Sequence, residues 1–184
     1  LHRGVWGLPR EGRREDPGVE DGMRQGRKEG ADVVGGAPYM DKESHGQIAT
    51  IFAMAKQCGA DIDFHLDFGL DPARLDLDEV CRMAEATGWG GRVAIGHVTK
   101  LSAMPKGDFE AAAKRLANAG VAVTVLPATD LFLTGRDSVF NVPLGVTSAH
   151  GRRGCGGNAN TTTNNRPNTF TTSGGGWPAR RGSR

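Results

Sequence analysis

The sequence lacks long hydrophobic runs, paired cysteines and nucleotide-binding loops. No apolar run approaches the roughly 20 residues that cross a bilayer, and the first residues, LHRGVWGLPREGRRED, have no apolar segment typical of a secretion signal. Cys58, Cys81 and Cys155 show no CxxC spacing, which argues against a zinc knuckle and a disulfide framework. Neither GxGxxG nor GxxxxGK[ST] occurs. We therefore expect a cytoplasmic protein without a membrane span, in which Cys58 and Cys81 are reduced core residues.

Charge and apolar residues are unevenly distributed along the chain. Residues 151–184, the C-terminal tail, hold six arginines and no acidic residue, which leaves 17 of the 23 basic and all 21 acidic residues in 1–150. The C-terminal tail also contains no Val, Ile, Leu or Met. So little apolar surface does not offset the entropy of ordering the backbone, about 1 to 2 kcal/mol per residue. We expect one domain over 1–150 and a poorly ordered tail rich in Gly, Thr, Asn and Arg.

One pattern recurs between residue 30 and about residue 127: a helical segment, a glycine, and a short run rich in β-branched residues. The copies are RQGRKEG with ADVVGG, AMAKQCG with ADIDFHLDF, MAEATGWGG with RVAIGHV, and KRLANAG with VAVTVLP. Each glycine stands where the end of a helix takes positive φ. The apolar runs are typical of strands covered on both faces. Ser44, Asp76 or Asp78, and Asp108 are the predicted helix starts. The pattern predicts an α/β fold with a parallel sheet.

Titratable side chains follow the predicted strands. They are Glu11, His65, Asp67, His97 and Asp130. The carboxyl ends of parallel strands lie at one edge of a sheet, and active sites of TIM barrels are built at that edge. An open doubly wound sheet would instead favour a glycine-rich loop after its first strand.

His65 and His97 would end neighbouring strands. They can share a divalent metal, or one can bind metal while the other polarises a substrate; alternatively, both are hydrogen-bonded structural histidines. Two histidines alone do not make a catalytic zinc site, because three protein ligands are usual. Asp67 can orient His65 or meet a substrate amine, or it can cap the following helix. Asp130 and Arg136 can face a substrate or form a solvated pair.

Six segments together carry a resemblance to a known family. In order, they are PREG, GADVVGGAPYMD, DIDFHLDF, GRVAIGHVTKLSAM, VTVLPATDLFLTGR and TTTNNRPNTF. This order resembles the cytosine deaminase branch of the amidohydrolase superfamily, which includes N-isopropylammelide isopropylamidohydrolase. The similarity covers residues 5–150 and extends faintly to about residue 176. It implies a partial TIM (β/α)8 barrel of the metal-dependent hydrolase type, roughly strands three to eight, that hydrolyses a C–N bond of a small nitrogen heterocycle.

The resemblance also implies roles for individual residues. His65 takes the place of the strand-five metal ligand, and His97 that of the strand-six histidine that contacts metal-bound water or substrate. Arg10 stands where deaminases carry a substrate-reading glutamine, and Asn164 where the strand-eight aspartate binds metal and acts as base. The expected metal is zinc or iron. The predicted site is then His97 and Asp67 for catalysis, Arg10 and Asp130 for substrate, and His65 and Asn164 for metal.

The sequence departs from the family pattern at several positions. The strand-one His-x-His pair is absent from this chain, Phe68 replaces a glutamate, and Asn164 and Asn165 replace an acidic pair. An amide oxygen can bind a metal, but it does not accept a proton at neutral pH. We therefore expect a fragment, altered near both ends, with an incomplete metal site and weak or no activity as written.

Two other functions stay open. The chain can be a non-catalytic barrel remnant that binds a small heterocycle, or a nucleic-acid-binding protein that uses the arginines of the C-terminal tail. That tail offers only Phe170 and Trp177 for stacking and no repeated basic-aromatic pattern, so we do not expect a nucleic-acid partner. The unpaired edges of a partial barrel are prone to association, which makes a homo-oligomer a further expectation.

Overall fold

The computed structural model describes residues 6–7, 21, 25–26, 30, 32–134, 145, 147, 159–163 and 166–168. The elements are, in order, β1 (Trp6–Gly7), β2 (Val33–Gly36), η1 (Pro38–Met40), α2 (Ser44–Cys58), β3 (Asp61–Leu66), α3 (Leu77–Thr87), β4 (Val93–His97), η2 (Thr99–Ala103), α4 (Lys106–Asn118), β5 (Val121–Val125), α5 (Pro127–Leu133), β6 (Ala159–Thr163) and β7 (Arg166–Asn168). They form one seven-stranded sheet in the order β1 to β7. Neighbouring strands are parallel except β6 and β7, which are antiparallel. The predicted α/β fold with a parallel sheet is confirmed.

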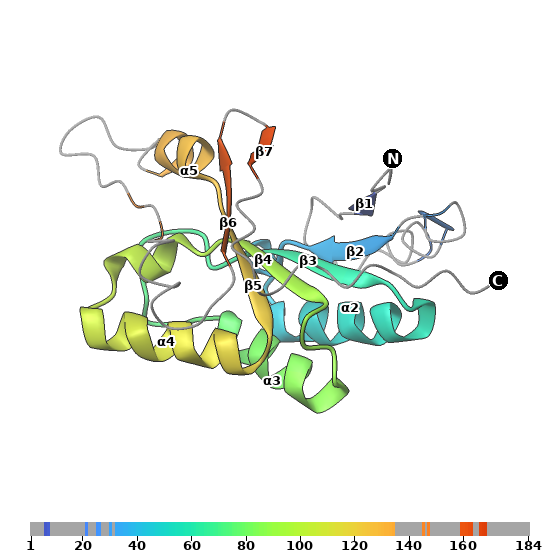
Figure 1. The fold of residues 1–184 in the computed structure, drawn as a ribbon. Helices are drawn as coiled ribbons and strands as arrows, with labels where there is room; N and C mark the ends of the chain where they lie inside the picture. The colour runs from blue at the N-terminus through green and yellow to red at the C-terminus, as the bar shows by residue number, and fades with distance from the viewer. Residues whose placement is uncertain are drawn as a thin grey trace.

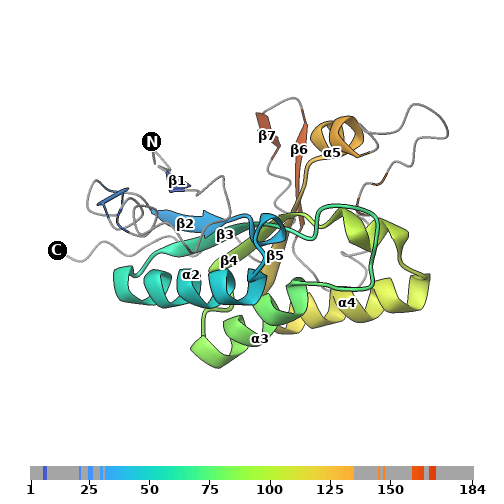
Figure 2. The same ribbon diagram turned by 180° about the vertical axis from the view of Figure 1, so that it is seen from behind.

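Helices α2, α3 and α4 lie on the same face of the sheet in both views (Figures 1 and 2). On β3 the buried residues Ile62, Phe64 and Leu66 alternate with half-buried ones. The ring of Phe64 packs against the ring of Phe52 on α2, with the ring centroids 6.0 Å apart. The strands were predicted to be covered on both faces, but β3 and β5 alternate between buried and half-buried residues. The helices α2, α3 and α4, which connect β2 to β5, lie on one side of the sheet, as in an arc of a barrel, so the other face of these strands is left to polar and small side chains.

Three glycines end the helices as predicted. Their φ angles lie between 62° and 66°, in the left-handed region that a residue with a side chain adopts only under strain: Gly59, Gly88 and Gly120. The helix-to-strand turns are therefore fixed by the sequence.

The predicted helix starts are right for α3 and wrong for two others. Helix α3 begins directly after Asp76, but the residues preceding α2 and α4 are Glu43 and Pro105, and neither start has a side-chain cap. Ser44 is instead the first residue of α2, and its hydroxyl donates to Asp76, 2.8 Å away. A contact between two helices has replaced the local cap that the sequence suggested.

Cys81 is fully buried and Cys58 is half-buried against the core, as predicted. Cys155 lies outside the described residues. Within the described part of the chain, no helix is both long and apolar enough to span a membrane. The C-terminal tail contributes β6 and β7, and its expected disorder concerns residues outside the description and stays a prediction.

Candidate active site

Three titratable side chains meet at the carboxyl ends of β3, β4 and β5: His65 and His97 are among the last residues of β3 and β4, and Asp130 follows β5. Nδ1 of His65 lies 3.0 Å from Nε2 of His97. Nδ1 of His97 lies 2.7 Å from Oδ1 of Asp130, which belongs to α5. The prediction that the two histidines lie together at one edge of a parallel sheet is confirmed.

His97 reaches His65 because its backbone leaves strand geometry. In the sheet register His97 pairs with Leu66, and Gly96 pairs with His65. Register partners point to the same face, so a regular strand would direct His97 with Leu66 toward the helices. Instead, His97 and Val98 have φ angles of 67° and 45°. This left-handed turn carries the imidazole to the face where His65 lies.

With Asp130 as a carboxylate and His97 as a neutral imidazole, the two hydrogen bonds assign each proton of the group to one atom. An ionised carboxylate only accepts hydrogen bonds, so His97 donates from Nδ1 to Asp130. In neutral His97, Nε2 is then an acceptor, and His65 donates to it from Nδ1. Nε2 of His65 is left with a lone pair. The relay from Asp130 through His97 thus orients His65 as a ligand for a cation.

Burial shapes the electrostatics around this relay. Burial and the neighbouring His97 lower the pKa of His65, which favours the neutral imidazole that binds metals. Burial raises the pKa of Asp63 to about 7, an effect partly offset by His97. Asp130 is completely buried, and its Oδ2 has no hydrogen-bond partner among the residues described. The site therefore combines a neutral histidine with acidic groups held away from water.

A row of aromatic rings continues from the two histidines. Phe68 packs edge-on against His97 with ring centroids 5.4 Å apart, and Tyr39 of η1 lies 5.8 Å from Phe68. Burial raises the pKa of Tyr39. At the position where the resembled family was expected to carry a glutamate, the site thus has the apolar ring of Phe68 in contact with His97.

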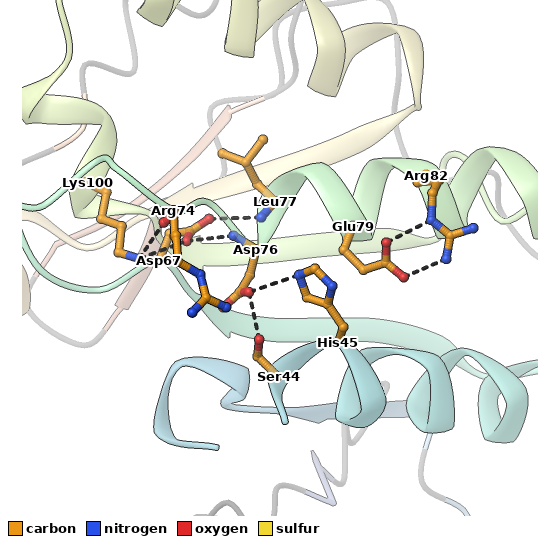
Figure 3. A network of polar contacts seen from close by, with 9 residues as sticks. All are labelled: Ser44, His45, Asp67, Arg74, Asp76, Leu77, Glu79, Arg82 and Lys100. Carbon is orange, nitrogen blue, oxygen red and sulfur yellow. Dashed lines mark hydrogen bonds and ion pairs between the residues drawn. The ribbon is translucent and has the colours of Figure 1, made fainter. Parts of the chain in front are cut away.

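Asp67 is bound to the start of α3 (Figure 3). Its carboxylate accepts from the backbone N–H groups of Asp76 and Leu77, each at 2.9 Å, and lies 3.4 Å from Nζ of Lys100. Burial nevertheless raises the pKa of this carboxyl group. Within the described residues no hydrogen bond joins Asp67 to His65. These contacts match the helix-capping alternative, and a catalytic role for Asp67 finds no contact to support it.

The same network ties α3 to α2 (Figure 3). Asp76 accepts a hydrogen bond from Ser44, and its Oδ1 lies 3.5 Å from Nε2 of His45. The His45 side chain is 60% exposed. His45 is therefore an exposed histidine outside the relay, and its substitution can serve as a control for substitution of His65.

The remaining predicted residues have different outcomes. Arg10, Glu11, Arg136 and Asn164 lie outside the described residues. Asp130 was predicted to follow a strand in a loop, where it would face substrate or form a solvated pair. It lies in α5 and is completely buried, so the solvated pair is wrong. The packing of α5 against the sheet removes it from water, and no local sequence pattern indicated this.

The described side chains offer fewer free donor atoms than a metal site needs. No group of three or more His, Cys, Asp or Glu side chains in the described ranges is placed to hold a metal ion, whereas a catalytic zinc usually has three protein ligands. Both ring nitrogens of His97 are engaged, and His65 keeps Nε2. The described residues therefore fit one ligand of a metal rather than a whole site.

Comparisons with known proteins extend this description. No model of a protein family matches the chain. A pterin deaminase from Rhizobium rhizogenes (strain K84 / ATCC BAA-868) is 27% identical over 109 residues, which cover 59% of this chain and 25% of the relative. A solved structure of 5-methylcytosine deaminase from Klebsiella pneumoniae, liganded with phosphonocytosine, has a TM-score of 0.77 at 23% identity, over 85% of this chain and 39% of that one. N-isopropylammelide isopropylaminohydrolase from Burkholderia multivorans ATCC 17616 has a TM-score of 0.67 at 23% identity, over 85% and 37%.

This chain spans a quarter of the length of the pterin deaminase and under two fifths of the length of the solved structures. Over that span, it shares its fold with the two solved enzymes and part of its sequence with the deaminase. The resemblance to the deaminase branch of the amidohydrolase superfamily, found in the sequence, is thereby confirmed.

Proposed function

We propose that this chain is part of a metal-dependent hydrolase that removes ammonia or an amine from a nitrogen heterocycle. The observation that carries the proposal is the relay from Asp130 through His97 to His65 at the carboxyl edge of the parallel sheet. The names of the similar proteins, for pterin, 5-methylcytosine and N-isopropylammelide, support this substrate class. The finer assignments, including barrel strands three to eight, a cytoplasmic location and self-association, stay predictions.

His65 is proposed to hold the metal through Nε2. The other ligands would come from outside the described residues, with Asn164 as one candidate, and zinc and iron are the proposed metals. When bound, a divalent metal supplies a water nucleophile that is active at neutral pH. Asp130 contributes at a distance, because its hold on Nδ1 of His97 keeps the His65 lone pair directed outward.

His97 is proposed to move the proton that must reach the departing nitrogen. The Asp130 carboxylate beside Nδ1 stabilises the imidazolium that forms when Nε2 takes up a proton. Nε2 also accepts the hydrogen bond from His65, so proton uptake requires the two rings to move apart. Asn164 does not accept a proton at neutral pH, and Phe68 has replaced the glutamate. The buried pair of His97 and Asp130 is therefore the acid–base unit that we assign to the described residues.

Metal retention tests this proposal directly. The full chain is loaded with zinc or iron, passed through gel filtration and analysed for bound metal. We expect His65→Ala to lose the metal that the parent chain retains, and His45→Ala, an exposed histidine outside the relay, to retain it. Equal metal content in His65→Ala and the parent chain would overturn the assignment.

Turnover is measured separately, as release of ammonia or amine from pterin, 5-methylcytosine and N-isopropylammelide. We expect release to depend on metal and on His97. Metal retention through His65 without any release would identify the non-catalytic remnant instead.

A further inference from the structure

The turn at His97 and Val98 is strained, and the position of the imidazole depends on it. Both residues have left-handed backbone angles, with φ of 67° and 45°. For a β-branched residue such as Val98 this conformation is an outlier. Such conformations persist only where the surroundings over-determine them. What holds the turn therefore decides where His97 points.

Thr147 binds the carbonyl groups of both strained residues. Its Oγ1 lies 2.6 Å from the oxygen of Val98 and 3.2 Å from the oxygen of His97. A hydroxyl has one hydrogen, so the donor bond goes to the closer Val98 oxygen. On the other side, the N–H of Val98 bonds to the carbonyl of Leu66 at 3.0 Å. Thr147 is 2% exposed, so water does not replace its hydroxyl.

The segment that carries this threonine is anchored a second time, at Gly145. The backbone N–H of Gly145 donates to Oγ1 of Thr134, with 3.4 Å between nitrogen and oxygen. The hydroxyl of Thr134 in turn donates to the backbone carbonyl oxygen of Asp130, 2.6 Å away. A Cβ atom at Gly145 would overlap the side chains of Leu70 and Ser102. The same segment thus contacts both the turn of His97 and the helix that carries its carboxylate partner.

We propose that Gly145 and Thr147 form a clasp and that Thr147 is a positioning residue for His97. Its hydroxyl holds the left-handed turn that swings the imidazole from the helix face of the sheet to the face of His65, within reach of Asp130. Without the hydroxyl, the backbone of His97 and Val98 relaxes toward extended geometry. The imidazole of His97 then points to the helix face of the sheet, as the side chain of Leu66 does. The consequence for turnover rests on the proposed function, whereas the effect on the position of His97 does not.

The test is imidazole nitrogen NMR on the metal-free chain. In the parent chain, the proton on Nδ1 of His97 gives a resonance that exchanges slowly with water, because Asp130 binds it in a buried site. We expect Thr147→Val, which keeps the shape and removes the hydroxyl, to lose this resonance. We expect Thr147→Ser to restore it. Retention of the resonance in Thr147→Val would overturn the clasp.

A matched control and a second variant keep the test decisive. Thr87→Val also removes a hydroxyl that donates to a backbone carbonyl, that of Met83 at 2.6 Å, and it is expected to leave the resonance unchanged. If Thr147→Val does not fold, Gly145→Ala displaces the same segment without removing a hydroxyl. A resonance that persists in a folded Gly145→Ala also overturns the clasp.

Kinetics separate this inference from the proposed function. If the enzyme is active, Thr147→Val should lower kcat by about a hundredfold, the scale of general acid–base catalysis, with KM nearly unchanged. If Thr147→Val loses the resonance but the parent chain binds no metal, the clasp is supported and the proposed hydrolase function is contradicted. Full kcat in a metal-loaded Thr147→Val enzyme that has lost the resonance would contradict the acid–base role of His97 and leave the clasp unaffected, whereas full kcat with the resonance retained would overturn the clasp.

Discussion

Nδ1 of His97 and Oδ1 of Asp130 lie 2.7 Å apart, although 33 positions separate the two residues in the sequence. Asp130 is fully buried and His97 is 5% exposed, so water does not substitute for either partner. The bond fixes the tautomer of His97 and, through it, the lone pair of His65. The geometry of the site depends on this pair.

Removing the Asp130 carboxylate is expected to destabilise the protein. Asp130→Ala leaves the N–H of His97 buried without an acceptor, which costs about 1 to 3 kcal/mol in the free energy of unfolding. Asp130→Asn keeps an acceptor oxygen and should cost less. Asp78→Ala is the control, since it removes an exposed ion pair with Arg115 worth less than about 1 kcal/mol. Urea denaturation measures all three, and an Asp130→Ala cost no larger than that of Asp78→Ala would contradict the buried bond.

Asp63 should make stability fall as the pH rises. Burial raises the pKa of its carboxyl group from 3.8 to about 7, so between these values the folded chain retains a proton that the unfolded chain has released. Each pH unit between the two pKa values is worth about 1.4 kcal/mol. Asp63→Asn should therefore exceed the parent chain in free energy of unfolding at pH 8, by on the order of 4 kcal/mol at most, and match it below pH 3.8.

The control for this prediction is Asp108→Asn, which changes an exposed acid of α4. Urea denaturation of both variants across this pH range gives the answer. An Asp63→Asn protein no more stable than the parent chain at pH 8 would show that the carboxyl group is ionised in the fold without cost.

Asp67→Ala should lower the free energy of unfolding and leave metal retention unchanged. The carboxylate binds the first N–H groups of α3, and losing a helix cap costs about 1 to 2 kcal/mol. Thermal or urea unfolding measures the loss, and gel filtration of the metal-loaded chain measures metal retention. Loss of metal as complete as in His65→Ala would instead support the role that the sequence suggested for Asp67.

Cys81 should resist alkylation until the chain unfolds. Burial raises the pKa of its thiol to about 11, so only about one thiol in a thousand is ionised at pH 8, and the thiolate is the reactive form. Cys58, which is half-buried, is the internal comparison. Iodoacetamide labelling followed by peptide mass spectrometry should modify Cys58 first in the folded chain and both thiols in urea. Equal labelling rates in the folded chain would contradict the burial of Cys81.

Much of the architecture could be predicted because it depends on local chemistry. Gly59, Gly88 and Gly120 end helices in left-handed conformations that glycine adopts readily, and short apolar runs after them form parallel strands. His65 and His97 end neighbouring strands of such a sheet, so their meeting follows from topology. Phe68 could be identified as a departure from the family pattern, but its packing against His97 could not.

The sequence by itself determined the repeating units, the glycine turns and the edge of the sheet where the histidines lie. Only the tertiary structure decided that His97 leaves its strand in a left-handed turn, that Asp130 is buried against it, and that Asp67 binds a helix start instead of His65. Thr147 reaches its carbonyl partners across 49 and 50 positions. Periodicity and capping preferences act over a few residues, whereas these contacts exist only because packing brings distant segments together.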